Sequence, residues 1–221
     1  ALSFAAQHLS LGTGFLVSSA IAFIALVGTI TNLPETLRTK ADKARNIFDL
    51  GLGNLITGLV MPKVGILLII NFLIGTTFTI FTFAFQPYYL KVLGQDNKSL
   101  TLLFVTFGTL AFFMQSKGVA FLTQRFNLVT ILFLGLSVRS FSFILMPAVP
   151  NMVYFAIVSM VFALFNALVQ PMVSTLISLN AKPEAQGTVM GLNASYLNVS
   201  NAFGPIIAGM IVNQANPITY S

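Results

Sequence analysis

Residues 15–33, FLVSSAIAFIALVGTITNL, contain no charged side chain. An α-helix rises about 1.5 Å per residue, so about 20 apolar residues are needed to cross the ~30 Å of hydrocarbon in a bilayer. The stretch has the required length. A helix in the core of a soluble protein is seldom apolar on every side over such a distance. Residues 15–33 therefore predict a membrane-spanning helix.

The rest of the chain repeats this pattern between short polar segments. Hydrophobic residues make up 56% of the 221 residues and charged residues only 7%, against roughly 25% charged residues in an ordinary soluble domain. These charges are too few to build a solvated surface. The sequence predicts an all-α fold, a polytopic transmembrane helix bundle of about six spans. The spans are expected at roughly residues 12–34, 64–90, 99–121, 128–149, 152–179 and 187–212.

We expect three parts along the chain. Residues 1–34 hold the first span, residues 35–63 form a polar connector, and residues 64–221 hold the remaining spans as one bundle. Within the connector, residues 47–59 mix apolar residues with glycines, which predicts a short helix lying on the membrane surface. Both ends of the chain lie close to apolar segments, so we expect a fragment of a longer protein.

The basic residues predict an orientation in the membrane. If the spans alternate, most of the 11 Lys and Arg residues fall on the connector's side: Arg38, Lys40, Lys43, Arg45, Lys63, Lys117, Arg125 and Lys182. Lys91 and Lys98 fall on the opposite side. Cytoplasmic loops of membrane proteins carry an excess of Lys and Arg. We therefore expect the connector to be cytoplasmic.

Two of the predicted spans carry stripes of polar or small residues. The stripes share one helix face each because their members lie three or four residues apart: Asn71, Gly75, Thr79, Thr82 and Gln86, and then Asn166, Gln170, Ser174 and Ser178. An amide that faces lipid leaves hydrogen-bonding groups unpaired at a cost of several kcal/mol. Hydrogen bonds between helices, worth less than ~2 kcal/mol each, are one solution. The other is a water-filled substrate cavity, lined by Asn71, Thr79, Thr82, Gln86, Asn166, Gln170 and Ser174.

Arg139 is the only charged residue placed deep within a predicted span. An arginine at a helix centre costs roughly 2.5–3.5 kcal/mol on insertion scales, and such residues usually mark a pathway or a buried pair. No Asp or Glu lies within a predicted span. Two interpretations stay open: a functional buried charge, or a side chain that extends to the membrane interface.

The last predicted span combines glycines with a proline. Gly187 and Gly191 have the spacing of a small-residue contact, which lets two helices approach closely. Pro205 removes one helical hydrogen bond and should bend the span. We expect Gly187, Gly191, Gly204, Pro205 and Gly209 to serve helix packing.

In their order along the chain, these features resemble the C-terminal half of a major facilitator superfamily transporter, in particular the drug:proton antiporters that include tetracycline efflux pumps. Ser200-x-x-x-Gly204-Pro205-x-x-Ala208-Gly209 is similar to the antiporter motif Gly-x-x-x-Gly-Pro-x-x-Gly-Gly. Leu33-Pro34-Glu35-Thr36-Leu37 looks like the exit of span six in that family. The resemblance implies that residues 1–34 are span six and that residues 64–221 hold spans seven to eleven. Residues 120–127 occupy the position of the family's loop motif Gly-x-x-x-Asp-Arg-x-Gly, and Arg125 is the one motif residue present there.

The resemblance implies a secondary-active transporter that exports a small organic or drug-like molecule by alternating access, with the proton as a candidate coupling ion. Its implied partners are the lipid bilayer, a small-molecule substrate and the N-terminal half of the same transporter, and its implied location is the bacterial inner membrane. In the family, spans seven and ten face the central cavity, which agrees with the two polar stripes. The alternative is a non-transporting integral subunit of a larger membrane complex.

Other classes of function find little support in the residues. The absence of cysteine and the single histidine, His8, exclude thiolate sites and histidine metal clusters. No hydrolase or metalloprotease motif occurs. The net charge of +6 is not gathered into a basic patch with interleaved aromatic residues, as a nucleic-acid surface would be. We expect no enzymatic activity, no cofactor, no metal and no nucleic-acid partner.

Overall fold

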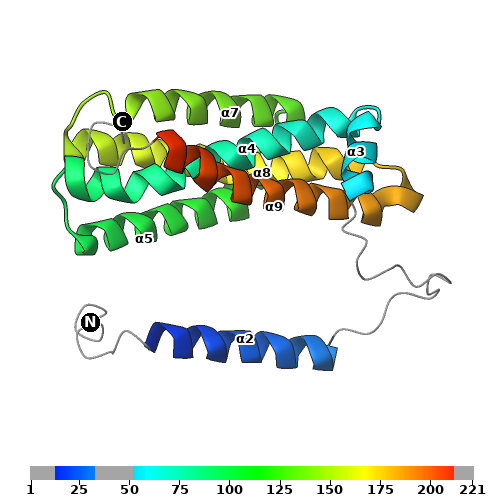
Figure 1. Ribbon diagram of the computed structural model, residues 1–221, viewed down its shortest axis with the longest axis horizontal. Coiled ribbons are helices and arrows are strands. Elements are labelled where there is room, and N and C mark those ends of the chain that lie inside the picture. Colours follow the sequence, from blue (N-terminus) through cyan, green and yellow to red (C-terminus); the bar gives the residue numbers. More distant parts are fainter. Residues whose placement is uncertain (1–12, 33–51, 212–221) are drawn as a thin grey trace. The chain divides into compact units, whose positions relative to one another are not determined.

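The computed structural model describes residues 13–32 and 52–211, which form helices joined by turns (Figure 1). The chain divides into two compact units after Asp49. In the first unit, helix α2 (Thr13–Asn32) is long and apolar enough to cross a membrane. The hydroxyls of Thr29 and Thr31 each donate to a carbonyl one turn earlier in α2, at 2.9 Å. The helix therefore satisfies these polar side chains by itself.

The second unit contains the other described helices. In chain order they are α3 (Leu52–Val60), α4 (Val64–Pro87), the π-helical turn η1 (Tyr88–Val92), α5 (Asn97–Phe113), the π-helical turn η2 (Met114–Gly118), α6 (Val119–Thr123), α7 (Leu128–Leu145), α8 (Met152–Asn180), the short 3₁₀ turn η3 (Pro183–Ala185) and α9 (Gln186–Ile211). The predicted all-α fold is confirmed.

Five of the described helical segments are long and apolar enough to span a bilayer: Phe15–Asn32, Val64–Val92, Asn97–Thr123, Leu128–Leu145 and Met152–Asn180. Helix α9, predicted as a further span, has 26 residues but is not among them. Its asparagines and serines lower its hydropathy. A helix that buries such residues against neighbouring helices can still cross a bilayer, because the amides then bond to protein instead of facing lipid.

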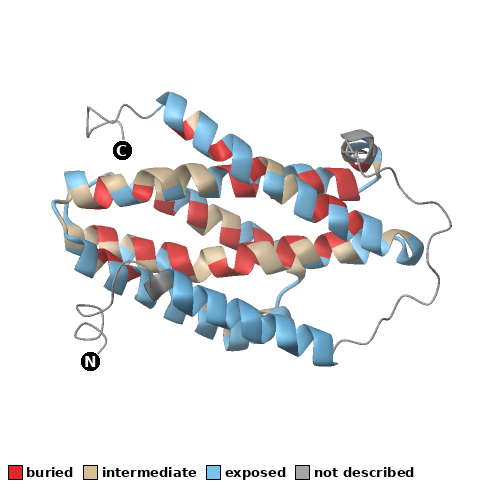
Figure 2. Cartoon of the chain, turned by 60° about the horizontal axis from the view of Figure 1, so that its bottom comes forward, coloured by how far each residue is buried: buried red, intermediate tan, exposed pale blue. Residues whose placement is uncertain are grey.

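Helix α4 packs against α9, and α8 packs against both α7 and α5 (Figure 1). Buried residues lie where the helices face one another, and the outer faces are largely exposed (Figure 2). One hydrophobic core joins α4, α7, α8 and α9 around Leu68, Ile131, Leu168, Val173, Ile177 and Val189. An outer surface of exposed Phe, Leu, Ile and Val side chains is what a lipid environment requires of a helix bundle.

A second core, rich in aromatic residues, joins α4 and η1 to α5 and α8. Phe85 packs on Phe155 with the ring centroids 5.3 Å apart, and Tyr88 stacks on the same ring at 5.5 Å. The π-helical turn that contains Tyr88 follows directly on Pro87. Proline lacks a backbone N–H, so it weakens the α-helical ladder at the point where the wider turn begins.

Side-chain caps fix where several helices begin. The carboxylate of Asp96 accepts from the backbone N–H of Ser99 at 2.9 Å and starts α5, and the side chain of Asn127 starts α7 in the same way. Hydrogen bonds from Ser99 hold the pKa of the Asp96 carboxyl below its usual value. Before this cap, Gly94 takes a φ of 63°, a left-handed conformation that glycine adopts without steric cost.

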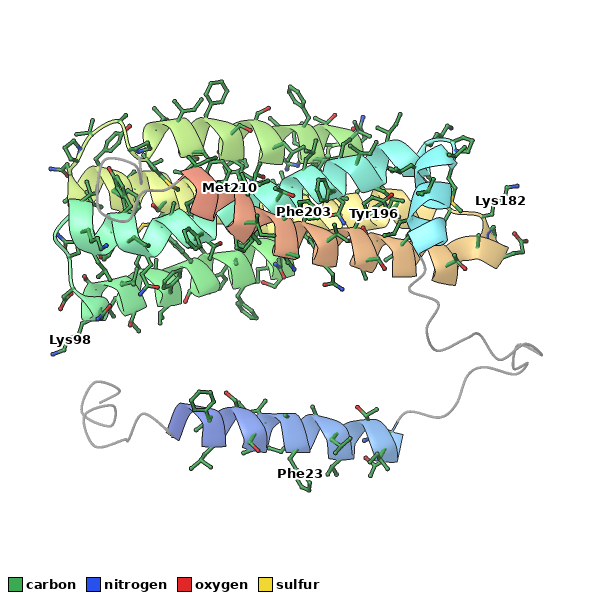
Figure 3. All side chains as sticks on the ribbon, in the orientation of Figure 1. Phe23, Lys98, Lys182, Tyr196, Phe203 and Met210 are labelled. Atoms are coloured by element: carbon green, nitrogen blue, oxygen red, sulfur yellow. The ribbon has the colours of Figure 1, made fainter. Side chains whose placement is uncertain are left out.

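Helix α3 covers one end of the bundle. The hydroxyl of Tyr196 in α9 (Figure 3) donates to the carbonyl of Leu55 in α3 at 2.7 Å. Residues 35–51 of the predicted connector lie outside the described residues. Helix α3 overlaps residues 47–59, the stretch expected to form a surface helix. Its position on a membrane remains a prediction, as do the three predicted parts of the chain.

Candidate functional site

The predicted polar stripe on α4 divides between two environments. Asn71 is fully buried. A Cβ atom at Gly75 would contact a side chain of α9, and the hydroxyl of Thr79 reaches a backbone carbonyl of α9 at 3.4 Å. Thr82 and Gln86, further along α4, are exposed. The first part of the stripe therefore belongs to the interface between α4 and α9, and only its second part lies open.

A buried amide cluster links α4, α8 and α9. The amide nitrogen of Asn71 donates to the side-chain oxygen of Asn193 at 2.7 Å and lies 3.3 Å from the backbone carbonyl of the same residue. Gln170 donates to the side-chain oxygen of Asn71 at 3.2 Å, and Asn193 donates to the hydroxyl of Ser174 at 3.4 Å. The cluster thus gives the amides of three helices partners that lipid cannot supply.

Two glycines bring α4 and α9 into close contact. A Cβ atom at Gly204 would collide with the hydroxyl of Thr79 and lie 3.2 Å from the carbonyl oxygen of Thr76. A Cβ atom at Gly75 would collide with the side chain of Ser200. Only glycine permits this approach of the two backbones.

The other predicted packing residues do not make such contacts. A Cβ atom built at Gly187, Gly191 or Gly209 meets no described atom within 4 Å. Pro205 is exposed, and α9 continues through it to Ile211. The expected close contact of Gly187 and Gly191 is therefore absent from the described part of the chain. These two residues lie near the start of α9 and are both exposed, whereas Val189 and Leu192 of the same turns are buried against other helices.

Arg139, in α7, is 3% exposed. Its Nη2 atom donates to the carbonyl of Ile74 and to the hydroxyl of Thr77, both at 2.7 Å and both in α4. The guanidinium carbon also lies 5.3 Å from the ring centroid of Phe143, within the range of cation–π attraction. The structure thus places this charge between α7 and α4. Among the described residues, no group of three His, Cys, Asp or Glu side chains could hold a metal ion.

A pocket of about 270 Å³, named the polar pocket after its four polar lining residues, lies between α4, α7, α8 and α9. Arg139, Asn166, Gln170 and Asn201 supply its polar lining. The remaining lining residues are Ile74, Gly75, Phe78, Val169 and Leu197. Few polar groups in a largely apolar wall are typical of small-molecule sites, because burial gives affinity and the polar groups fix orientation.

An aromatic pocket of about 430 Å³ lies between α4, α5 and α8. Its wall contains Phe78, Phe81, Phe85, Phe104, Phe107 and Phe162, together with Thr82 and Gln115. The ring centroids of Phe81 and Phe162 lie 4.7 Å apart. Phe78, Asn166 and Gln170 line this pocket and the polar pocket alike. The two pockets therefore adjoin, with amides at their shared wall.

The structure assigns the predicted cavity residues to different positions. Those that line a pocket are Thr82, Asn166 and Gln170. Those that reach across to another helix from the stripes are Asn71, Thr79, Gln170 and Ser174. Gln86 is exposed and lines neither pocket. Contact with a substrate stays a prediction for all of them.

Sequence reasoning missed two parts of the site. Asn201 was not included, although it lies eight residues after Asn193 and so shares a helix face with it. Phe78, Phe81 and Phe85 of α4 lie three and four residues apart, which also indicates one face, but periodicity alone cannot separate a pocket wall from a lipid-facing surface. Helix α5 contributes no polar residue to the aromatic pocket, and Gln115 belongs to the following turn η2.

Comparison with known proteins agrees with these observations. A family model of the Major Facilitator Superfamily matches residues 67–219, which include every residue that lines the two pockets. Neither the curated proteins nor the solved structures gave a match. The expected resemblance is confirmed for the superfamily, whereas the likeness to drug:proton antiporters remains a prediction. The chain belongs to the Major Facilitator Superfamily, and is thus an integral membrane protein of a transporter family and not an enzyme.

Proposed function

We propose that the chain forms the C-terminal half of a twelve-span transporter that exports a small organic or drug-like molecule, with the proton as coupling ion. The observation that carries this proposal is the adjoining pair of pockets. An amphipathic molecule could place its apolar part among the phenylalanines and its polar part against Asn166 and Gln170. The likeness of residues 200–209 to the antiporter motif supports export and proton coupling. The proposed location is the bacterial inner membrane.

Alternating access requires that the two halves of a transporter move against each other around a central site. The pockets are built mainly from α4 and α8, which correspond to spans seven and ten in the proposed assignment. In the family these spans face the central cavity. The tight contact of α4 with α9 at Gly75 and Gly204 should let the bundle move as one body.

Filling the aromatic pocket should abolish most transport. Thr82 lines this pocket, so Thr82→Phe introduces a ring into space that the substrate needs. We expect at least a tenfold lower export rate, about 1.4 kcal/mol at the limiting step. The measurement is export of a panel of small organic compounds, tetracycline first, from cells that express the full-length protein, normalised to protein abundance.

Thr109→Phe is the matched control. Thr109 is exposed on α5 and lines neither pocket. Like Thr82, it donates its hydroxyl to a carbonyl one turn earlier, at 2.8 Å, so both substitutions remove the same bond and add the same ring. Equal export by the two variants would show that the pocket is not on the substrate path. If the wild type exports no compound of the panel, the non-transporting subunit is favoured instead.

The orientation can be tested within the bundle itself. Lys98 and Lys182 lie at opposite ends of the bundle (Figure 3), and the excess of basic residues puts Lys182 on the cytoplasmic side. The chain has no cysteine of its own. In intact cells, an impermeant thiol reagent should label Lys98→Cys and spare Lys182→Cys until the membrane is permeabilised. The reverse labelling pattern would overturn the orientation.

A further inference from the structure

We propose that the transported substrate is an amphipathic organic anion, a carboxylate or sulfonate, and that Arg139 binds its charged group. This inference rests on the proposed function and names the substrate class for the same pair of pockets. It starts from the one buried charge in the described bundle.

Several N–H donors of the Arg139 guanidinium have no hydrogen-bond partner among the described residues. Of its three nitrogens, only Nη2 has hydrogen-bond partners among the described residues, Ile74 and Thr77 on α4. A guanidinium carries five N–H donors, so those on the other two nitrogens remain available. Arg139 also lines the polar pocket. The bonds to α4 hold the side chain in place, and we infer that its remaining donors bind the anion.

No carboxylate in the described bundle neutralises this charge. The acidic residues found there are Asp96 and Glu184, both exposed and both outside the long helices, and neither forms a hydrogen bond with Arg139. A cation buried in a low-dielectric environment attracts an anion strongly, because water does not screen it. The rings of Phe78 and Phe143, with centroids 5.8 and 5.3 Å from the guanidinium carbon, contribute cation–π attraction only.

The neighbouring residues suit an anion with an apolar body. Asn166, Gln170 and Asn201 line the same pocket as Arg139, and their amide groups can donate to further oxygens of a bound carboxylate or sulfonate. The aromatic pocket adjoins this site through Phe78 and has room for fused rings. The charged group of such an anion can therefore occupy the polar pocket while its apolar part occupies the adjoining aromatic pocket.

The test compares two dyes that differ in one group. The dye 8-anilinonaphthalene-1-sulfonate is an aromatic anion, and N-phenyl-1-naphthylamine has the same rings without the sulfonate. Equilibrium dialysis against the purified full-length protein in detergent, with protein-free micelles as the blank, gives both affinities. We expect the anionic dye to bind the wild type. Arg139→Gln should weaken binding of the anionic dye at least tenfold and change binding of the neutral dye less than twofold. Arg139→Lys should retain most of the affinity for the anionic dye.

Two further variants keep the result decisive. Asn201→Asp adds a negative charge to the pocket at an exposed position of α9 and should also weaken binding of the anion alone, by at least fivefold, even if Arg139→Gln does not fold. Arg125→Gln removes an exposed arginine outside both pockets and should change neither affinity.

Three results would overturn the proposal. The first is that the anionic dye does not bind the wild type, and the second is that Arg139→Gln and Asn201→Asp weaken binding of both dyes equally. The third is that neither variant weakens binding of the anionic dye. The last would mean that a carboxylate elsewhere in the protein neutralises Arg139. Because dialysis requires no transport, the outcome is independent of the export test. Loss of anion binding together with equal export by Thr82→Phe and Thr109→Phe would support the anion site and refute the export path.

Discussion

Gly204→Leu is expected to lower the free energy of unfolding by about 3 kcal/mol, the upper part of the range for overpacking a tight interface. A side chain at this position would collide with Thr79 and approach the carbonyl of Thr76, which is backbone and cannot turn aside. Gly204 lines neither pocket, so ligand affinity in the folded fraction should not change. Chemical or thermal unfolding in detergent measures the first effect, and equilibrium binding measures the second.

Gly209→Leu provides the control in the same helix. A Cβ atom there meets no described atom within 4 Å, so this variant should be about as stable as the wild type. If Gly204→Leu is equally stable, the close contact of α4 and α9 does not exist in the protein. A tenfold loss of ligand affinity, about 1.4 kcal/mol, with full stability would instead place Gly204 in the binding site.

Asn71→Leu is expected to cost about 2 kcal/mol of stability, the middle of the range for leaving buried polar groups unpaired. Single hydrogen bonds between membrane helices are usually worth less, about 0.6 kcal/mol on average. Asn71, however, is fully buried and bonds to both Asn193 and Gln170. Its removal takes a partner from each of two other helices. Thermal unfolding of the purified variant measures the loss.

Asn198→Leu is the matched control, because Asn198 is an exposed asparagine of α9, and its replacement should change stability by no more than about 0.5 kcal/mol. In a double-mutant cycle, Asn71→Leu and Asn193→Leu should together cost less than the sum of the single variants, since the second change removes an acceptor that the first left unpaired. If Asn71→Leu stops transport but leaves stability unchanged, Asn71 contacts substrate and the structural interpretation is wrong.

The sequence alone determined the class of fold and much of its outline. Long apolar stretches such as residues 15–33 predict helices because a backbone in hydrocarbon must bond to itself, and helices α4 to α9 follow the predicted spans closely. The spacing of Asn71, Thr79 and Gln170 also identified helix faces that contact other helices. These conclusions depend on local periodicity, which one chain segment contains in full.

The tertiary structure decided which neighbour each face meets. Two residues of one stripe, Asn71 and Thr82, differ in role because α9 covers the first and leaves the second open to the aromatic pocket. Gly204 is tightly packed and Gly209 is not, although they lie in the same motif. Arg139 finds its acceptors 65 and 62 residues away, on α4. Periodicity fixes only the direction of a side chain from its own helix axis, whereas the register and crossing of the neighbouring helix decide whether that direction ends in a partner, a pocket or lipid.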